Sequence, residues 1–185
     1  MNSRTIIIIV LVISFCCSVV NAAQENYKDI ETEYYKLKAP LSIEQVRRNE
    51  ITLMNNQIAY EYAYAEANKK SKTSAFLAIT PEHARAVKKD ETRQALKVFA
   101  LSLRDTVIDP QCHSQVSDFT YTEIDGGDAI YFEILNKGCN VKFEKFWALI
   151  KGEYIFTIYL ARPEQGNEDV YLDLEKAIKG IKFKM

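Results

Sequence analysis

Histidine and cysteine, two residue types common at nucleophilic active sites, are scarce in this chain. It has two histidines, His83 and His113, and four cysteines, of which Cys112 and Cys139 lie outside the first 22 residues. Nucleophilic catalysis needs a nucleophile, a base and a group that orients the base. The sequence contains no Gly-x-Ser-x-Gly, Cys-x-x-Cys or His-Glu-x-x-His motif. A cryptic hydrolase or thiol enzyme that uses the adjacent Cys112 and His113 is therefore the catalytic hypothesis, and an exposed loop histidine beside a structural disulfide is its alternative.

The same cysteines and histidines could supply four zinc ligands by number, but their spacing matches no zinc motif, and a disulfide would remove two of them. Three acidic residues, Glu123, Asp125 and Asp128, surround a Gly-Gly turn without the regular spacing of a calcium loop. We therefore predict no metal site and no cofactor, and interpret the acidic turn as a hairpin turn with solvated carboxylates.

Two groups of side chains could bind a ligand without catalysis. Alternating tyrosines on one predicted strand offer flat contact area with a polar tip, and they are Tyr60, Tyr62 and Tyr64. A polar turn after them could attract an anionic partner or a lipid head group through Lys69, Lys70 and Lys72. The alternatives are a half-buried strand packed under a helix and a lysine turn that is simply solvated.

Residues 1–22 have the pattern of a signal peptide. Arg4 precedes an almost unbroken apolar run, and Ala22 provides the small residue that a signal peptidase requires before the cut. The apolar run is about 16 residues, shorter than the ~20 of a membrane-spanning helix. Phe15 before Cys16 argues against a lipidated cysteine. We therefore predict a secreted or periplasmic protein that keeps no membrane anchor after cleavage.

The rest of the chain, residues 23–185, has the size of one domain, and we expect its first residues, 23–33, to be flexible. Its nearly balanced charge, within a whole-chain net charge of −1, argues against a nucleic-acid binder. In an exported monomer, Cys112 and Cys139 are expected to form a disulfide that closes a long loop. Two buried free thiols are the alternative.

Hydrophobic periodicity predicts an α+β protein with an antiparallel meander. In the N-terminal half we expect a short strand at 34–39, a brief helix at 42–50 from the capping box Ser42-Gln45, a hairpin of 58–65 with 73–80, a helix that can begin at Pro81, and an amphipathic helix within 90–108 with Asp90 as its N-cap. In the C-terminal half we expect strands at 116–124, 129–135, 139–150 and 154–161, a helix at 168–179 with Gly180 as a left-handed cap, and an edge strand at 181–184.

The third strand of the meander alternates in a way that places it at the centre of the sheet. Val141, Phe143, Trp147 and Leu149 share one face, and Phe146 breaks the polarity of the other face. We therefore predict that both faces of its far half are covered.

Three segments of the chain resemble one known family. They are the run 124–129 (Ile-Asp-Gly-Gly-Asp-Ala), the turn 151–154 (Lys-Gly-Glu-Tyr) and the closing run 174–183, Leu-Glu-Lys-Ala-Ile-Lys-Gly-Ile-Lys-Phe. With the element order over residues 73–185, they look like the PsbP/DcrB-like family. The resemblance implies an antiparallel sheet flanked by helices, an α/β/α sandwich. It carries no catalytic residues, and it implies an accessory role in binding or assembly.

The sequence thus favours a secreted or periplasmic, non-catalytic accessory or binding protein that acts through its sheet face or its hairpin on an unidentified partner. A secreted effector or inhibitor that acts on another protein is the second hypothesis. The enzyme based on Cys112 and His113 is the third.

Overall fold

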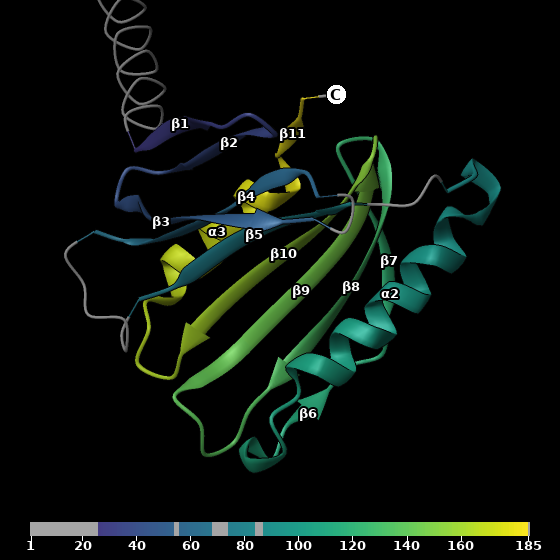
Figure 1. Cartoon of the computed structure of the whole chain (residues 1–185). Coiled ribbons are helices and arrows are strands. Elements are labelled where there is room, and N and C mark those ends of the chain that lie inside the picture. Colours follow the sequence, from purple (N-terminus) through teal and green to yellow (C-terminus); the bar gives the residue numbers. More distant parts are fainter. Residues whose placement is uncertain (1–25, 54–55, 68–73, 84–86, 185) are drawn as a thin grey trace, which may run out of the picture.

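Strands dominate the fold, which is a large twisted sheet with helices on both sides and a small second sheet (Figure 1). The computed structural model describes residues 26–53, 56–67, 74–83 and 87–184. The predicted signal peptide and the lysine turn at 69–72 lie outside these residues. No helix within the described ranges is long and apolar enough to cross a lipid bilayer.

The elements follow each other in the order β1 (Tyr27–Glu31), β2 (Tyr35–Pro40), β3 (Ile43–Thr52), β4 (Ile58–Glu66), β5 (Phe76–His83), η1 (Lys89–Glu91), α2 (Thr92–Val107), η2 (Pro110–Cys112), β6 (Gln115–Val116), β7 (Thr120–Ile124), β8 (Gly127–Leu135), β9 (Val141–Lys151), β10 (Tyr154–Pro163), α3 (Glu168–Lys179) and β11 (Lys182–Phe183). Strand β1 lies inside the interval 23–33, for which the sequence predicts flexibility, and it pairs with β2 along its whole length.

The large sheet has the strand order β3-β4-β5-β10-β9-β8-β6, with β7 also paired to β8. Its neighbours are antiparallel, and the segment from β6 to β10 is the predicted meander. Gly126, Gly138 and Gly152 have φ values of +69°, +88° and +54° in its connections, a backbone region that glycine enters without strain. The predicted α+β fold class is therefore confirmed, although the run 116–124 is divided into β6 and β7.

The main hydrophobic core lies between one face of the large sheet and a layer made of α3 and the small sheet β1-β2-β11. We call this the α3 face. Leu174 and Ile178 of α3 and Trp147 and Leu149 of β9 are all buried in it. Asn167 caps α3 by accepting hydrogen bonds from the backbone N–H groups of residues 169 and 170. Gly180 ends the helix with φ −95° and therefore not in the predicted left-handed conformation.

The opposite face, which we call the α2 face, is covered by α2 over β8 and β9 (Figure 1). Phe132 of β8, Phe146 of β9 and Tyr159 of β10 form a row of rings on it, with centroids 5.1 and 4.8 Å apart. Strand β9 is therefore central and covered on both faces, as predicted. The helix begins at Thr92 after a short 3₁₀ turn, and the predicted N-cap, Asp90, lies within that turn instead.

Two elements expected to be helical are strands. Residues 42–50 belong mostly to β3, which pairs antiparallel with β4 at the edge of the sheet. Pro81 does not begin a helix, because β5 continues to His83. The pairing of β5 with β4 ends at Ile79, so Pro81 lies where β5 has a strand on one side only. That is the setting in which a strand tolerates a residue without an N–H group.

The acidic turn between β7 and β8 connects distant parts of the chain. Asp125 accepts a hydrogen bond from the backbone N–H of Phe183 at 3.0 Å and pairs with the ammonium of Lys182 at 3.1 Å. Asp128 pairs with Arg93 of α2 at 2.9 Å. Two segments that carry the family resemblance, 124–129 and 174–183, therefore meet in space. Asp125 holds β11 in place, which corrects the interpretation of this carboxylate as merely solvated, and Asp128 forms an exposed ion pair with α2.

Candidate functional site

Cys112 and His113, the catalytic candidates from the sequence, lie in a loop that is closed by a disulfide. Cys112 and Cys139 form a disulfide, with their Cα atoms 5.4 Å apart. Cys112 lies in η2, outside the strands, so the loop can bring it across to Cys139. His113 follows with a left-handed backbone and an exposed side chain. A cysteine nucleophile needs a thiolate, and the disulfide leaves none at this position.

The two histidines occur at opposite ends of the large sheet. His83 is the last residue of β5 and is paired with Tyr154, the first residue of β10. His113 precedes β6, which pairs with Leu135 at the end of β8. Because β8, β9, β10 and β5 are successively antiparallel, the end of β8 lies beside the end of β10 and away from its start. The backbone positions of residues 83 and 113 are therefore at opposite ends of the sheet.

Tyr64, one of the predicted ligand-binding tyrosines, is a core residue. It is fully buried on the α3 face, and its hydroxyl is 2.8 Å from the hydroxyl of Tyr35 in β2. Burial raises the pKa of Tyr64 to about 12 and raises the pKa of Tyr35 even further. Both hydroxyls therefore stay protonated at neutral pH. This pair joins the small sheet to the large one and does not line a groove.

Tyr60 and Tyr62, on the same strand as Tyr64, lie under the guanidinium of Arg48. The guanidinium carbon is 3.6 Å from the centroid of the Tyr60 ring, a cation–π contact. The hydroxyl of Tyr62 accepts a hydrogen bond from Arg48 Nε at 3.1 Å and donates one to the carboxylate of Glu33. Each of these side chains is engaged with a neighbour from the chain itself, so they hold β3 and β4 against the segment that precedes β2.

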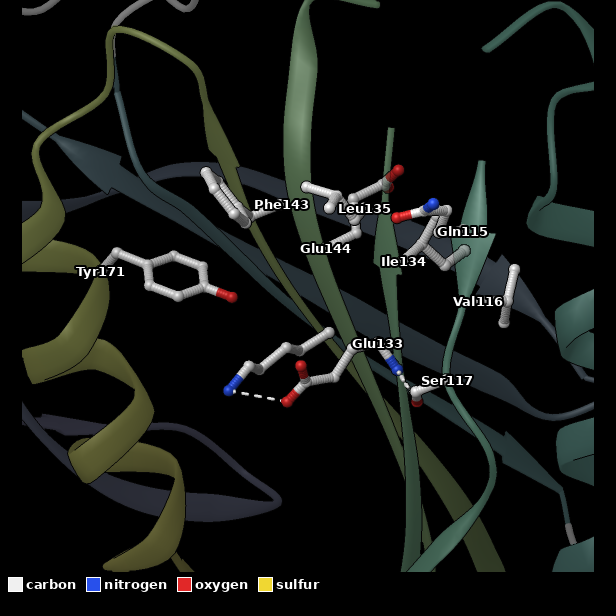
Figure 2. A pocket seen from close by; sticks show the side chains of 10 residues that line it. Gln115, Val116, Ser117, Glu133, Ile134, Leu135, Phe143, Glu144 and Tyr171 are labelled. Atoms are coloured by element: carbon white, nitrogen blue, oxygen red, sulfur yellow. Dashed lines mark hydrogen bonds and ion pairs between the residues drawn. The ribbon is translucent and has the colours of Figure 1, made fainter. Parts of the chain in front are cut away.

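A pocket of about 360 Å³ opens instead beside β6, between the end of β8, the start of β9 and α3 (Figure 2). The apolar side chains of Leu135 and Phe143 line it. Its polar surface includes Glu133, Ser117 and the hydroxyl of Tyr171, which points into the pocket from α3 (Figure 2). Ser117 Oγ accepts a hydrogen bond from the backbone N–H of Glu133 at 2.9 Å, which fixes β6 at this wall.

Lys145 provides the positive charge of the pocket. Its ammonium is 3.0 Å from a carboxylate oxygen of Glu133 and 3.0 Å from one of Glu175. Burial alone would lower the pKa of Lys145, but the hydrogen bonds to the two carboxylates outweigh it and leave the pKa above its ordinary value. Burial raises the pKa of Tyr171 to about 12. Near neutral pH the amine is thus charged and the phenol is neutral, so neither is ready to accept a proton.

This arrangement can bind a ligand, but it lacks a base next to a nucleophile. Lys145 is held as a cation, and Ser117 has no imidazole or free amine among the residues that line the pocket. Sequence reasoning missed this site. The sequence feature that could have indicated it is a break in the apolar face of β9, because Lys145 lies on the same strand face as Phe143 and Trp147. A cation on the apolar face of a central strand must be paired in the fold, and Glu175 comes from a helix 30 residues later.

The sheet and its flanking helices match solved structures of low sequence identity. A solution structure of cyanobacterial PsbP (CyanoP) from Synechocystis sp. PCC 6803 aligns with a TM-score of 0.52, over 86% of this chain and 93% of that chain, at 10% identity. The chain has a PsbP-like fold. A crystal structure from Bacteroides thetaiotaomicron VPI-5482 aligns over 86% of this chain with a TM-score of 0.55 and 10% identity, and the chain spans 49% of its length. No family model and no curated protein matches the sequence.

Proposed function

We propose that this is an exported, non-catalytic accessory protein that binds a partner protein through the pocket beside β6. One observation carries the proposal. The pocket combines an apolar floor with a lysine whose ammonium is paired to two carboxylates of the chain itself, and its lining residues include no imidazole beside Ser117. Binding pockets are mostly apolar, with a few placed polar groups that set orientation and specificity.

Export is supported by the leader pattern of residues 1–22 and by the Cys112–Cys139 disulfide, which is a bond typical of oxidising compartments. An accessory role is supported by the PsbP-like fold, as an expectation that comes with the resemblance. The partner is a protein, because about 360 Å³ accommodates an apolar side chain with its neighbours and is at the low end of the volumes used for small molecules.

Capture of partners by the purified protein tests the proposal. Leu135→Arg places a charge on the pocket floor, and Val98→Arg is the matched control, because Val98 is exposed on α2 away from the pocket. A protein that is retained by the wild type and by Val98→Arg, but not by Leu135→Arg, supports the proposal once the purified pair reproduces the binding. Equal retention by all three forms would contradict it.

Activity assays test the non-catalytic part. The purified protein is expected to hydrolyse p-nitrophenyl acetate, casein and p-nitrophenyl phosphate no faster than the buffer does. Hydrolysis that disappears in His113→Ala would overturn this expectation and restore the enzyme hypothesis.

A further inference from the structure

The large sheet has two edges, and they differ in their protection against strand pairing. Strand β3, at one edge, carries charges of both signs and a register irregularity between Gln45 and Arg47. Mixed charges and bulges are devices that keep an edge strand from pairing with another chain. At the other edge, residues 115–119 contain no lysine, arginine or proline. This edge, β6, is also the one that borders the pocket.

The backbone of β6 has hydrogen-bonding groups that point away from the sheet. The N–H of Ser117 donates to the carbonyl of Glu133 in β8 at 2.9 Å. Successive N–H groups of an extended strand point to opposite sides. The N–H and C=O of Val116 are therefore directed outward, where an added strand could pair with them.

The pocket lies where such an added strand would place its side chains. Gln115 and Ser117 line the pocket, whereas Val116 between them also packs on the α2 face. A strand beside β6 would lie about 4.8 Å away and would turn every second side chain toward the α3 face. One of these side chains would lie next to Gln115 and Ser117, at the mouth of the cavity whose floor is Leu135 and Phe143.

Electrostatics favours a basic segment. The side chain of Glu133 is 45% exposed at the pocket, and Asp118 is exposed on the same edge segment. Lys145, the basic residue that lines the pocket, is occupied by Glu133 and Glu175. A cation that approaches this mouth therefore meets the exposed part of the Glu133 carboxylate, without an exposed lysine or arginine on β6.

We infer that the partner binds by strand addition: an extended segment pairs with β6, inserts one apolar side chain into the pocket, and places basic side chains beside Glu133. This inference rests on the proposed function and specifies its partner. Main-chain hydrogen bonds to the sheet edge provide affinity, and the pocket selects the side chain.

A synthetic nonapeptide tests the inference directly. It has leucine at the centre, lysine two positions to either side, and threonine elsewhere, so that leucine and both lysines share one face. We expect it to shift the amide NMR signals of residues 115–117 and 133–135. A copy N-methylated at two alternate amides should bind about 30-fold more weakly, because it loses two main-chain hydrogen bonds. A copy with glutamates in place of the lysines should also bind more weakly.

Variants separate this inference from the proposed function. Val116→Pro removes the outward donor, and Glu50→Pro makes the same change on the opposite edge. Loss of peptide binding in Val116→Pro alone supports strand addition. Equal binding of the N-methylated peptide, which requires no folded variant, overturns it, and so does the absence of any shift at residues 115–117. If strand addition is overturned by either result but Leu135→Arg still abolishes partner capture, the proposed function through the pocket is retained and only the inference of strand addition is rejected.

Discussion

The carboxylate of Asp125 is the best single test of how the C-terminal strand is held. Its side chain is 17% exposed and accepts from the N–H of Phe183 at 3.0 Å. Such a charged hydrogen bond contributes about 1.5–3 kcal/mol, and the contact with the exposed Lys182 adds less than about 1 kcal/mol. Asp125→Ala should therefore lower the free energy of unfolding by about 2–3 kcal/mol. For a domain of this size, the melting temperature should fall by roughly 4–12 °C.

Urea unfolding followed by fluorescence provides the assay, because Trp147 is the single tryptophan and is 4% exposed. Asp125→Asn keeps an acceptor oxygen and a side chain that tolerates the backbone φ of +51°, so it should cost only about 1 kcal/mol. Glu123→Ala is the control, since Glu123 is exposed on the same hairpin. If Asp125→Ala destabilises the protein no more than Glu123→Ala does, the contact of Asp125 with β11 has no energetic role and the reasoning is wrong.

The pH dependence of the same contact has a definite sign. Burial acts to raise the pKa of Asp125, but the Phe183 N–H and the ammonium groups of Lys182 and Lys151 outweigh it and hold the pKa below its ordinary value of 3.8. A lowered pKa in the folded state stabilises the fold above pH 3.8, and this contribution is lost as the pH falls through the folded pKa. The stability difference between wild type and Asp125→Asn should therefore shrink on acidification below about pH 4.

Three further perturbations follow from the contacts described. The native protein should show no reactive thiol at Cys112 or Cys139 with a thiol reagent, and Cys139→Ser should lower the free energy of unfolding by about 3.5 kcal/mol, the chain-entropy value for this loop. Tyr35→Phe should cost about 1–3 kcal/mol in urea unfolding, because it leaves the buried hydroxyl of Tyr64 without its partner. Lys145→Met should destabilise the protein at pH 7 and recover part of the loss near pH 4, where Glu133, left without its lysine, and Glu175, left with Lys179 alone, take up protons; equal losses at both pH values would contradict this.

The segments that sequence reasoning located correctly carry a local signal strong enough to survive tertiary packing. The connections β7–β8, β8–β9 and β9–β10 each contain a glycine with positive φ. Strand β9 has one mostly apolar face, interrupted by Lys145, that ends in a two-sided apolar run. Helix α3 combines an amphipathic stripe with Asn167 at its start. In each case the propensity, the periodicity and the turn chemistry agree, which is the condition under which local sequence specifies structure.

The segment 42–50 was predicted wrongly because an edge strand exposed on both faces has no alternation to detect. All residues from 44 to 50 are exposed, so its polar composition resembles that of a solvated helix, and Ser42-Gln45 imitates a capping box. What makes it a strand is non-local. It pairs with β4, whose tyrosines hold Arg48 through the hydrogen bond to Tyr62 and the contact over Tyr60.

The candidate site was beyond sequence reasoning for a related reason. Its residues come from β6, β8, β9 and α3, which are adjacent only after the meander is closed and α3 has packed on it. Lys145 was visible in the sequence as a cation within the apolar face of β9, but its two acidic partners could not be chosen among the many other glutamates. The tyrosine stripe was visible as well, and its contacts with residues 33–35 depend on the position of the small sheet.

The pairing of β2 with β11 joins Lys36 to Lys182, near the two extremes of the described chain. Contacts between such distant segments are slow to form, since a long loop must close, at a cost in chain entropy, before the contacts stabilise the fold. The layer that seals the main core therefore has to wait for residues 181–184 to emerge during synthesis. Until those residues are available, the inner surface of β2 and the α3 face of the large sheet have no complete partner layer, so the core closes in the last stage of folding.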